Sequence, residues 1–351
     1  MTSAIEPCRL DGLRPDNLLA FLALLGALRA LEAVDATAGE GDRLFPRVSW
    51  SVDQPPVRPR LHLARALTPD EIAARIDAGI ELLAADHDFD GKPDLNHLGA
   101  EARALALQAR EVATATTRSR ADLVSALMCD AAVKESKGST PAGIDPTPLC
   151  LLFGQGHQHF LDRLVAVPKT AAPPKRGRGK TAVDVTAAQA LAEALFAPWH
   201  YDDPTFSFRW DPLEATRYAM MAGDPTNGAY KQGTQHGANR LAAVGLACLT
   251  LAPQQRGDRV RVLCLGGANM EGKFSLAWPI FAFPMTLASL RALLAHPDLR
   301  QPGSLKHLGV DHVMVTERIP VGKFMNFTTA GVPREAVSAD PEARKSGPRN
   351  G

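Results

Sequence analysis

The chain has 351 residues, of which 45% are hydrophobic and 22% are charged, enough for about two domains and a sizeable buried core. Its five cysteines are scattered and form no CxxC pair, which excludes a zinc ribbon and argues against a disulfide framework. The most apolar stretch, residues 18–28, is too short to span a bilayer and lacks the features of a signal peptide. We therefore expect a soluble cytoplasmic protein.

The formal net charge of +1 conceals an uneven distribution along the chain. Residues 1–164 contain 17 Lys and Arg against 23 Asp and Glu, a net charge of −6. Residues 165–330 contain 18 against 12, a net charge of +6. This asymmetry indicates either that the second half contacts an anion or polyanion, or that the two halves attract each other.

Helix signals dominate the first half. The Pro15–Asn17 segment predicts a cap for a helix whose apolar residues recur at helical spacing from residue 18 to 28. The sequence Thr68-Pro-Asp-Glu71 predicts a capping box that opens a second helix. Further helices are predicted over 99–114 and 119–132, and short strands over 48–52 and 60–64.

A segment rich in Pro, Gly and positive charge, residues 167–181, interrupts this pattern and predicts an exposed loop. Beyond it we expect helices over 187–196, 241–251 and 287–294, the last capped by Thr286, and strands over 206–210, 259–265 and 313–327. The fold class is therefore α+β, with a helix-rich N-terminal half and a mixed α/β C-terminal half. The predicted units are an acidic helix-rich domain (1–166), a basic linker (167–185), a basic α+β domain (186–332) and a flexible tail (333–351).

Several features favour contact with nucleic acid. The basic linker suits a phosphate backbone, and cations alternate with aromatic residues in the second half, as single-strand binding requires. Two glycine-bearing runs, 154–159 and 231–240, each precede an apolar helix and are candidate phosphate cradles. The alternative is that these glycines form tight turns. The candidate nucleic-acid-binding residues are Lys175, Arg176, Arg178, Lys180, Gln155, His157, Arg209, Lys231, Asn239, Arg240, Arg259, Arg261 and Lys323.

Two other function classes remain open. His157, His159, His200 and Asp203 are residue types of a hydrolytic metal centre, although none sits in a recognised metal-binding spacing. A metal-dependent hydrolase or nuclease is therefore one alternative. A bridging protein that contacts other subunits without touching nucleic acid is the other. No catalytic motif is present, so we expect no enzyme activity, no cofactor and no resident metal.

Six motifs occur in order between residues 9 and 330: LDGLRPDNLLAFLALLGALRAL, GQGHQHFL, FRWDPLEATRYAMMAGDP, GANRLAAVGL, AWPIF and RIPVGKFMNFT. In these motifs the chain resembles CRISPR-associated proteins of type I-G (formerly I-U) effector complexes. The resemblance implies a bacterial antiviral system in which subunits carrying guide RNA find complementary foreign DNA and a separate helicase-nuclease cleaves it. This chain is similar to the large-subunit-like or accessory component.

The partners implied by the resemblance are guide RNA or target DNA, the other effector subunits and the helicase-nuclease, with no membrane contact. The motifs themselves carry no established functional residues. The candidate residues above therefore rest on charge and loop composition.

Overall fold

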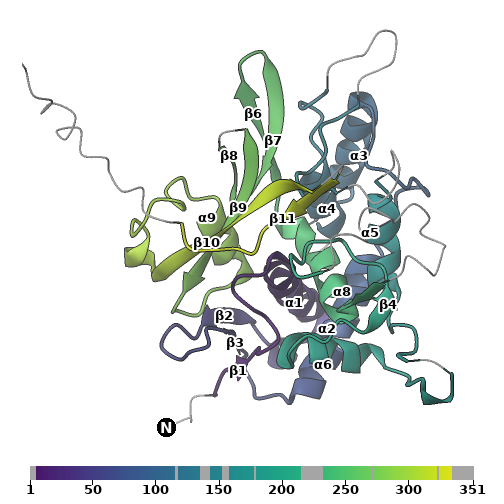
Figure 1. Cartoon of the computed structure of the whole chain (residues 1–351), viewed down its shortest axis with the longest axis vertical. Coiled ribbons are helices and arrows are strands. Elements are labelled where there is room, and N and C mark those ends of the chain that lie inside the picture. Colours follow the sequence, from purple (N-terminus) through teal and green to yellow (C-terminus); the bar gives the residue numbers. More distant parts are fainter. Residues whose placement is uncertain are drawn as a thin grey trace, which may run out of the picture.

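Helix α1 (Leu18–Thr37) lies at the centre of the molecule (Figure 1). Asn17 caps it by accepting a hydrogen bond from the Ala20 amide at 3.2 Å, as the sequence predicts. Every residue from Leu18 to Leu31 is buried, because neighbouring elements cover the helix on several sides. At Gly26 the backbones nearly touch, since a Cβ there would lie 1.9 Å from the carbonyl oxygen of Leu241.

The computed structural model describes residues 5–114, 118–134, 143–151, 158–177, 179–214, 232–270, 272–321 and 324–333. These residues form eight α-helices: α1, α2 (Pro69–Ala84), α3 (Gly99–Glu111), α4 (Ser119–Leu127), α5 (Phe160–Lys169), α6 (Ala187–Phe196), α8 (His236–Gly245) and α9 (Leu287–Leu294). Short 3-10 turns occur at η1 (Glu40–Asp42), η2 (Gly179–Thr181), η4 (Leu246–Cys248) and η5 (Lys306–Leu308).

The strands form small antiparallel sheets. One has the order β1-β3-β2, from β1 (Cys8–Arg9), β2 (Arg47–Trp50) and β3 (Pro59–His62). The largest has the order β11-β10-β9-β8, from β8 (Gly267–Met270), β9 (Lys273–Phe281), β10 (Val310–Val321) and β11 (Phe324–Phe327). Two further two-stranded sheets pair β4 (Asp203–Thr205) with β5 (Gln232–Thr234) and, in a hairpin, β6 (Leu251–Arg256) with β7 (Arg259–Cys264).

The α+β class is confirmed, with the helices concentrated in the first half and the strands in the second. The helix caps that the sequence predicts are confirmed. Thr68 and Glu71 form the predicted capping box, and Thr286 caps α9. These elements depend on hydrogen bonds within one turn, which a sequence displays directly.

The predicted strand over 206–210 is wrong. The segment is irregular, and Arg209 adopts a left-handed φ of 60° that a strand does not allow. The alternation of Phe208 and Trp210 reflects burial instead: their rings stack at 4.4 Å between centroids, and both side chains lie in the core. Alternating aromatic residues therefore do not distinguish this buried loop from a strand.

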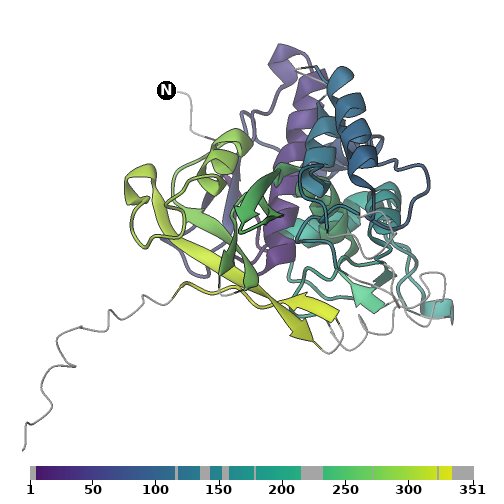
Figure 2. The ribbon, with the colours of Figure 1, turned by 90° about the horizontal axis from the view of Figure 1, so that it is seen from above.

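The acidic and basic parts of the sequence contribute to one hydrophobic core, which extends from Leu10 to Ala330. Figure 2 shows the four-stranded sheet on one side of α1 and helices α3 and α4 on the other. Phe21 of α1 stacks on Trp278 of β9 at 4.9 Å. Across the described ranges, no helix combines the length and apolar character needed to cross a membrane.

Two buried histidines are expected to make the fold sensitive to acid. Burial lowers the pKa of His87 to about 3 and that of His236 to about 4, from an ordinary value of 6.5. As the pH falls, the unfolded chain therefore binds a proton at each histidine before the folded protein does. The stability that the two neutral histidines contribute is complete above about pH 6.5 and is lost as the pH falls toward 4. Asp211 has the opposite effect on stability. Burial raises its pKa to about 6, so its protonation below pH 6 favours the folded protein.

We expect His87→Gln to reduce the loss of stability in acid. Between pH 6.5 and 5, the free energy of unfolding of the wild type should fall more steeply than that of the variant, by about 1.4 kcal/mol per pH unit. Urea unfolding across this pH range measures both slopes. His307→Gln, at an exposed histidine, serves as the control and should follow the wild type. Equal slopes for wild type and His87→Gln would contradict this account.

Candidate nucleic-acid interface

The β6–β7 hairpin projects from the body of the molecule (Figure 1). Its turn contains Gly257 with φ of 62°, a conformation that glycine adopts without strain. Arg259 and Arg261 are exposed on β7, whereas Val262 and Cys264 are buried, so the strand predicted over 259–265 is present and has one basic and one apolar face. In the pairing register Arg259 lies opposite Arg256, which places two basic residues beside the turn.

A polar cavity of about 320 Å³ lies at the base of this hairpin. The 145–150 segment forms one wall, and strands β7 to β10 form the other. The polar side chains that line the cavity are Asp145, Thr147, Arg261, Asn269 and Arg318. Residues far apart in the sequence thus meet at one surface hollow.

The charge of this cavity is positive. Arg261 lies 3.6 Å from Asp145, and its side chain is 45% exposed. Arg318 donates to the carbonyl oxygen of Pro148 at 2.8 Å and lies over the ring of Phe274 at 5.6 Å. Within the described residues no carboxylate is within ion-pairing distance of Arg318. Burial lowers the pKa of Arg318, but an arginine stays protonated in proteins, so two guanidinium groups face one carboxylate.

Such an arrangement suits a phosphodiester. Guanidinium groups bind phosphate oxygens through paired N–H donors, and a partly buried site strengthens these bonds. Arg318 was not a candidate from the sequence. The pairing of β9 with β10 brings the Arg318 guanidinium group to the same cavity as Arg261. No local sequence motif predicts this long-range pairing.

The basic linker residues lie apart from this cavity. Lys175 pairs with Asp184 at the surface at 2.9 Å, and Lys180 is exposed in η2. Arg176 instead turns inward. Its Nε donates to Asp203 at 2.6 Å, and its Nη2 donates to Glu193 at 2.7 Å. This side chain is held by two carboxylates and is not a free phosphate ligand.

Three other candidates are interior residues. Arg209 is buried and pairs with Glu214 at 3.1 Å. Arg240 is fully buried, and its Nη1 donates to Asp77 at 2.7 Å. Asn239 is also fully buried and accepts a hydrogen bond from the Phe208 amide at 3.1 Å. Because all three are enclosed and hydrogen-bonded within the fold, we remove them from the candidate interface.

The second predicted phosphate cradle, before α8, is filled from within the protein. The side chain of Asp203 is fully buried and accepts a hydrogen bond from the His236 amide at 3.0 Å, at the first residue of the helix. The helix N-terminus therefore does attract an anion, as expected, but the anion is a side chain of the fold. Five further candidates lie outside the described residues: Gln155, His157, Arg178, Lys231 and Lys323.

The residues of the metal-site alternative are dispersed among separate ion pairs. His159 lies 3.2 Å from Asp162, and His200 lies 3.1 Å from Glu193. Asp203 is paired with Arg176. Among the described residues, no group of three or more His, Cys, Asp or Glu side chains is placed to hold a metal ion; His157 lies outside this range.

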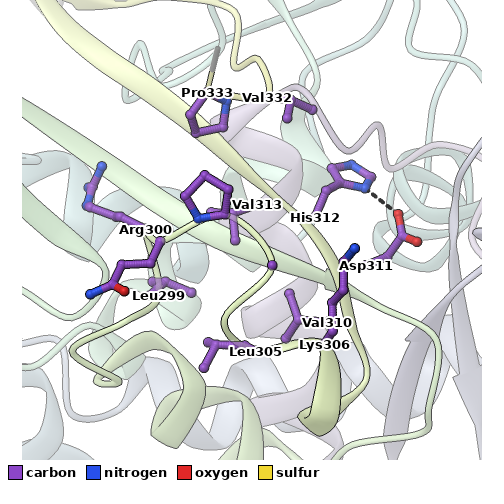
Figure 3. Close-up of a pocket in the computed structure, with 13 residues that line it drawn as sticks. Leu299, Arg300, Leu305, Lys306, Val310, Asp311, His312, Val313, Val332 and Pro333 are labelled. Carbon is purple, nitrogen blue, oxygen red and sulfur yellow. Dashed lines mark hydrogen bonds and ion pairs between the residues drawn. The ribbon is translucent and has the colours of Figure 1, made fainter. Parts of the chain in front are cut away.

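A second cavity of about 210 Å³ lies beside η5 and β10 (Figure 3). Asp311 and His312 face each other at its edge at 2.7 Å. Arg300 directs its guanidinium to the carbonyl oxygens of Gly266 and Ser275 at 2.8 and 3.0 Å. Lys306 also lines this cavity, beside the carboxylate of Asp311.

Comparison of the chain with known protein families and with curated proteins finds no match.

Proposed function

We propose that this protein is a non-catalytic subunit of a CRISPR interference complex that binds single-stranded nucleic acid. The observation that carries the nucleic-acid part is the cavity at the base of the β6–β7 hairpin, where Arg261 and Arg318 face Asp145, the one carboxylate among the described residues that line it. The CRISPR context rests on the resemblance of the sequence motifs to type I-G proteins. Base pairing to a guide RNA would supply the sequence specificity in such a complex.

The projecting hairpin supports this proposal. A two-stranded ribbon has little stability of its own and gains order when a partner lies along it. Its exposed side chains include Gln254, Gln255, Arg259 and Arg261 beside the one acidic residue Asp258, so a phosphate backbone is a better match than an apolar protein surface. In the proposed complex the strand runs along β7 and places one phosphate in the cavity, between the two arginines.

We expect Arg261→Gln and Arg318→Gln each to weaken binding of a single-stranded 30-mer oligonucleotide by about tenfold, since a charge-assisted hydrogen bond contributes about 1.5 kcal/mol. Fluorescence anisotropy measures the affinities. Arg103→Gln is the matched control, because Arg103 is a 73% exposed arginine on α3 outside the cavity. Arg318→Lys keeps the charge and should recover part of the affinity.

Two outcomes would overturn this proposal. One is wild-type protein that does not bind the oligonucleotide at low salt. The other is a loss in Arg103→Gln as large as in the cavity variants, which would indicate attraction to the overall surface charge. Capture of effector subunits that survives nuclease treatment, by a protein that does not bind nucleic acid, would support the bridging alternative.

A further inference from the structure

A third cavity lies on another part of the molecule, between the N-terminus of α1, the start of β3 and the chain that follows α6. Its volume is about 290 Å³, and the side chains used below are Arg14, Asn17, Arg58, Trp199, Tyr201 and Leu213. Gly12 allows the walls to meet, because a Cβ there would lie 2.3 Å from the carbonyl oxygen of Ala194 in α6. The cavity shares no residue with the proposed interface at the hairpin.

One wall carries an arginine without a counter-ion. Arg58 donates through Nε to the carbonyl oxygen of Asp11 at 2.9 Å and through Nη1 to that of Val57 at 2.8 Å. Over the described ranges, no carboxylate lies within ion-pairing distance of its guanidinium. Burial lowers the pKa of Arg58, while the nearby charges of Asp11 and Asp16 raise it and those of Arg14 and Arg9 lower it. An anion in the cavity would offset the cost of burying this cation.

The carboxylates around the cavity are already engaged. Asp16 accepts two hydrogen bonds from Arg14, at 3.0 and 2.6 Å, and Asp11 pairs with Arg9 at 2.9 Å. Asp211 accepts hydrogen bonds from Asn17 and Tyr201, each at 2.9 Å, and from the Leu213 amide at 2.8 Å. Among the described residues that line the cavity, Arg58 is therefore the cation whose partners are backbone carbonyl oxygens and not a carboxylate.

The opposite wall is aromatic and held in place. The Trp199 indole Nε1 donates to the carbonyl oxygen of Ala194 at 2.9 Å, and the Tyr201 hydroxyl donates to Asp211. The two rings meet edge to face, with centroids 6.2 Å apart and planes at 82°. Tyr201 has a left-handed φ of 60°, which is uncommon for a residue with a side chain. Rings fixed by hydrogen bonds offer a ready surface on which a planar base can stack.

We propose that this cavity binds a single nucleotide, with its base against Trp199 and its phosphate at Arg58. A phosphorylated nucleoside is the ligand class that combines one anionic group with one flat apolar ring. The cavity is at the small end of ligand sites, which begin at roughly 300 Å³, so it suits one nucleotide and not a polymer. The nucleotide is either free or the 5′-terminal unit of a strand.

Tryptophan fluorescence tests this proposal, because the other three tryptophans of the chain are buried and Trp199 is only partly so. We expect adenosine 5′-monophosphate to change the emission in a saturable manner and to bind about tenfold more tightly than adenosine or inorganic phosphate. A 5′-phosphorylated tetranucleotide added in parallel distinguishes the two sources. Tighter binding of the tetranucleotide assigns the site to a strand terminus, and tighter binding of the monophosphate assigns it to a free nucleotide.

Calorimetric titration of variants completes the test. Arg58→Gln and Trp199→Leu should each weaken binding of the monophosphate by about tenfold. Arg60→Gln, in β3 two residues beyond Arg58 and outside the cavity, should leave it unchanged. Trp199→Phe keeps a ring and guards against loss of folding in Trp199→Leu. Absence of binding at millimolar monophosphate, or binding that is equal in Arg58→Gln and wild type, would overturn the proposal whatever the result at the hairpin.

Discussion

Gly26→Ala is expected to destabilise the protein by about 3 kcal/mol, because the added methyl group has no space. A Cβ at this position would lie 1.9 Å from the carbonyl oxygen of Leu241 and 2.6 Å from its carbonyl carbon. Both are backbone atoms of α8, so no side-chain rotation relieves the overlap and the two central helices must separate. The better helix propensity of alanine offsets only about 1 kcal/mol of this cost. Urea unfolding measures the difference.

Gly39→Ala is the matched control for this prediction. Gly39 has an ordinary φ of −61°, and a Cβ there would meet nothing within 4 Å. Its free energy of unfolding should stay within about 0.5 kcal/mol of the wild-type value. Equal stability of Gly26→Ala and Gly39→Ala would contradict the close contact of α1 with α8.

Asp203→Ala is expected to cost about 3 kcal/mol, because it removes one partner of a buried ion pair. The carboxylate of Asp203 binds Arg176 through one oxygen and the amide of His236 through the other. Its loss leaves Arg176 with Glu193 alone and leaves the first amide of α8 without this acceptor. Thermal or urea unfolding at pH 7 measures the change.

A second carboxylate provides the comparison. Asp184 lies 2.9 Å from Lys175, a distance similar to that between Asp203 and Arg176, but both side chains of this pair are exposed. Exposed pairs contribute about 0–1 kcal/mol, so Asp184→Ala should have little effect. Equal losses for the two variants would mean that the Asp203 pair is open to solvent, contrary to its burial.

The secondary structure that could be predicted from the sequence is the part fixed by local chemistry. The caps at Asn17, Thr68 and Thr286 each depend on residues within one turn, and all three lie where expected. The strand at β7 was identified from its alternation of exposed arginines with buried apolar residues. The segment 206–210 failed because stacking of Phe208 on Trp210 inside the core produces the same alternation.

The candidate site was harder to predict, because the sequence reveals charge but not its counter-ion. The sequence alone does not distinguish Arg176, Arg240 and Arg261, because all three are arginines in the basic half of the chain. In the structure Arg176 and Arg240 are bound by carboxylates far away in the chain, whereas Arg261 remains at the surface. Arg318 was missed for the converse reason: only the sheet brings it to the same cavity.

In the proposed complex, Arg261 and Arg318 together bind one backbone phosphate of a single strand. The most direct test is the dependence of affinity on salt concentration for the wild type and for the double variant Arg261→Gln/Arg318→Gln. Each phosphate contact with a single strand contributes a slope of about −0.7 to a plot of log affinity against log salt. The account predicts that the double variant, which loses the one phosphate contact in the cavity, has a shallower slope by about 0.7. Parallel lines for the two proteins would contradict it.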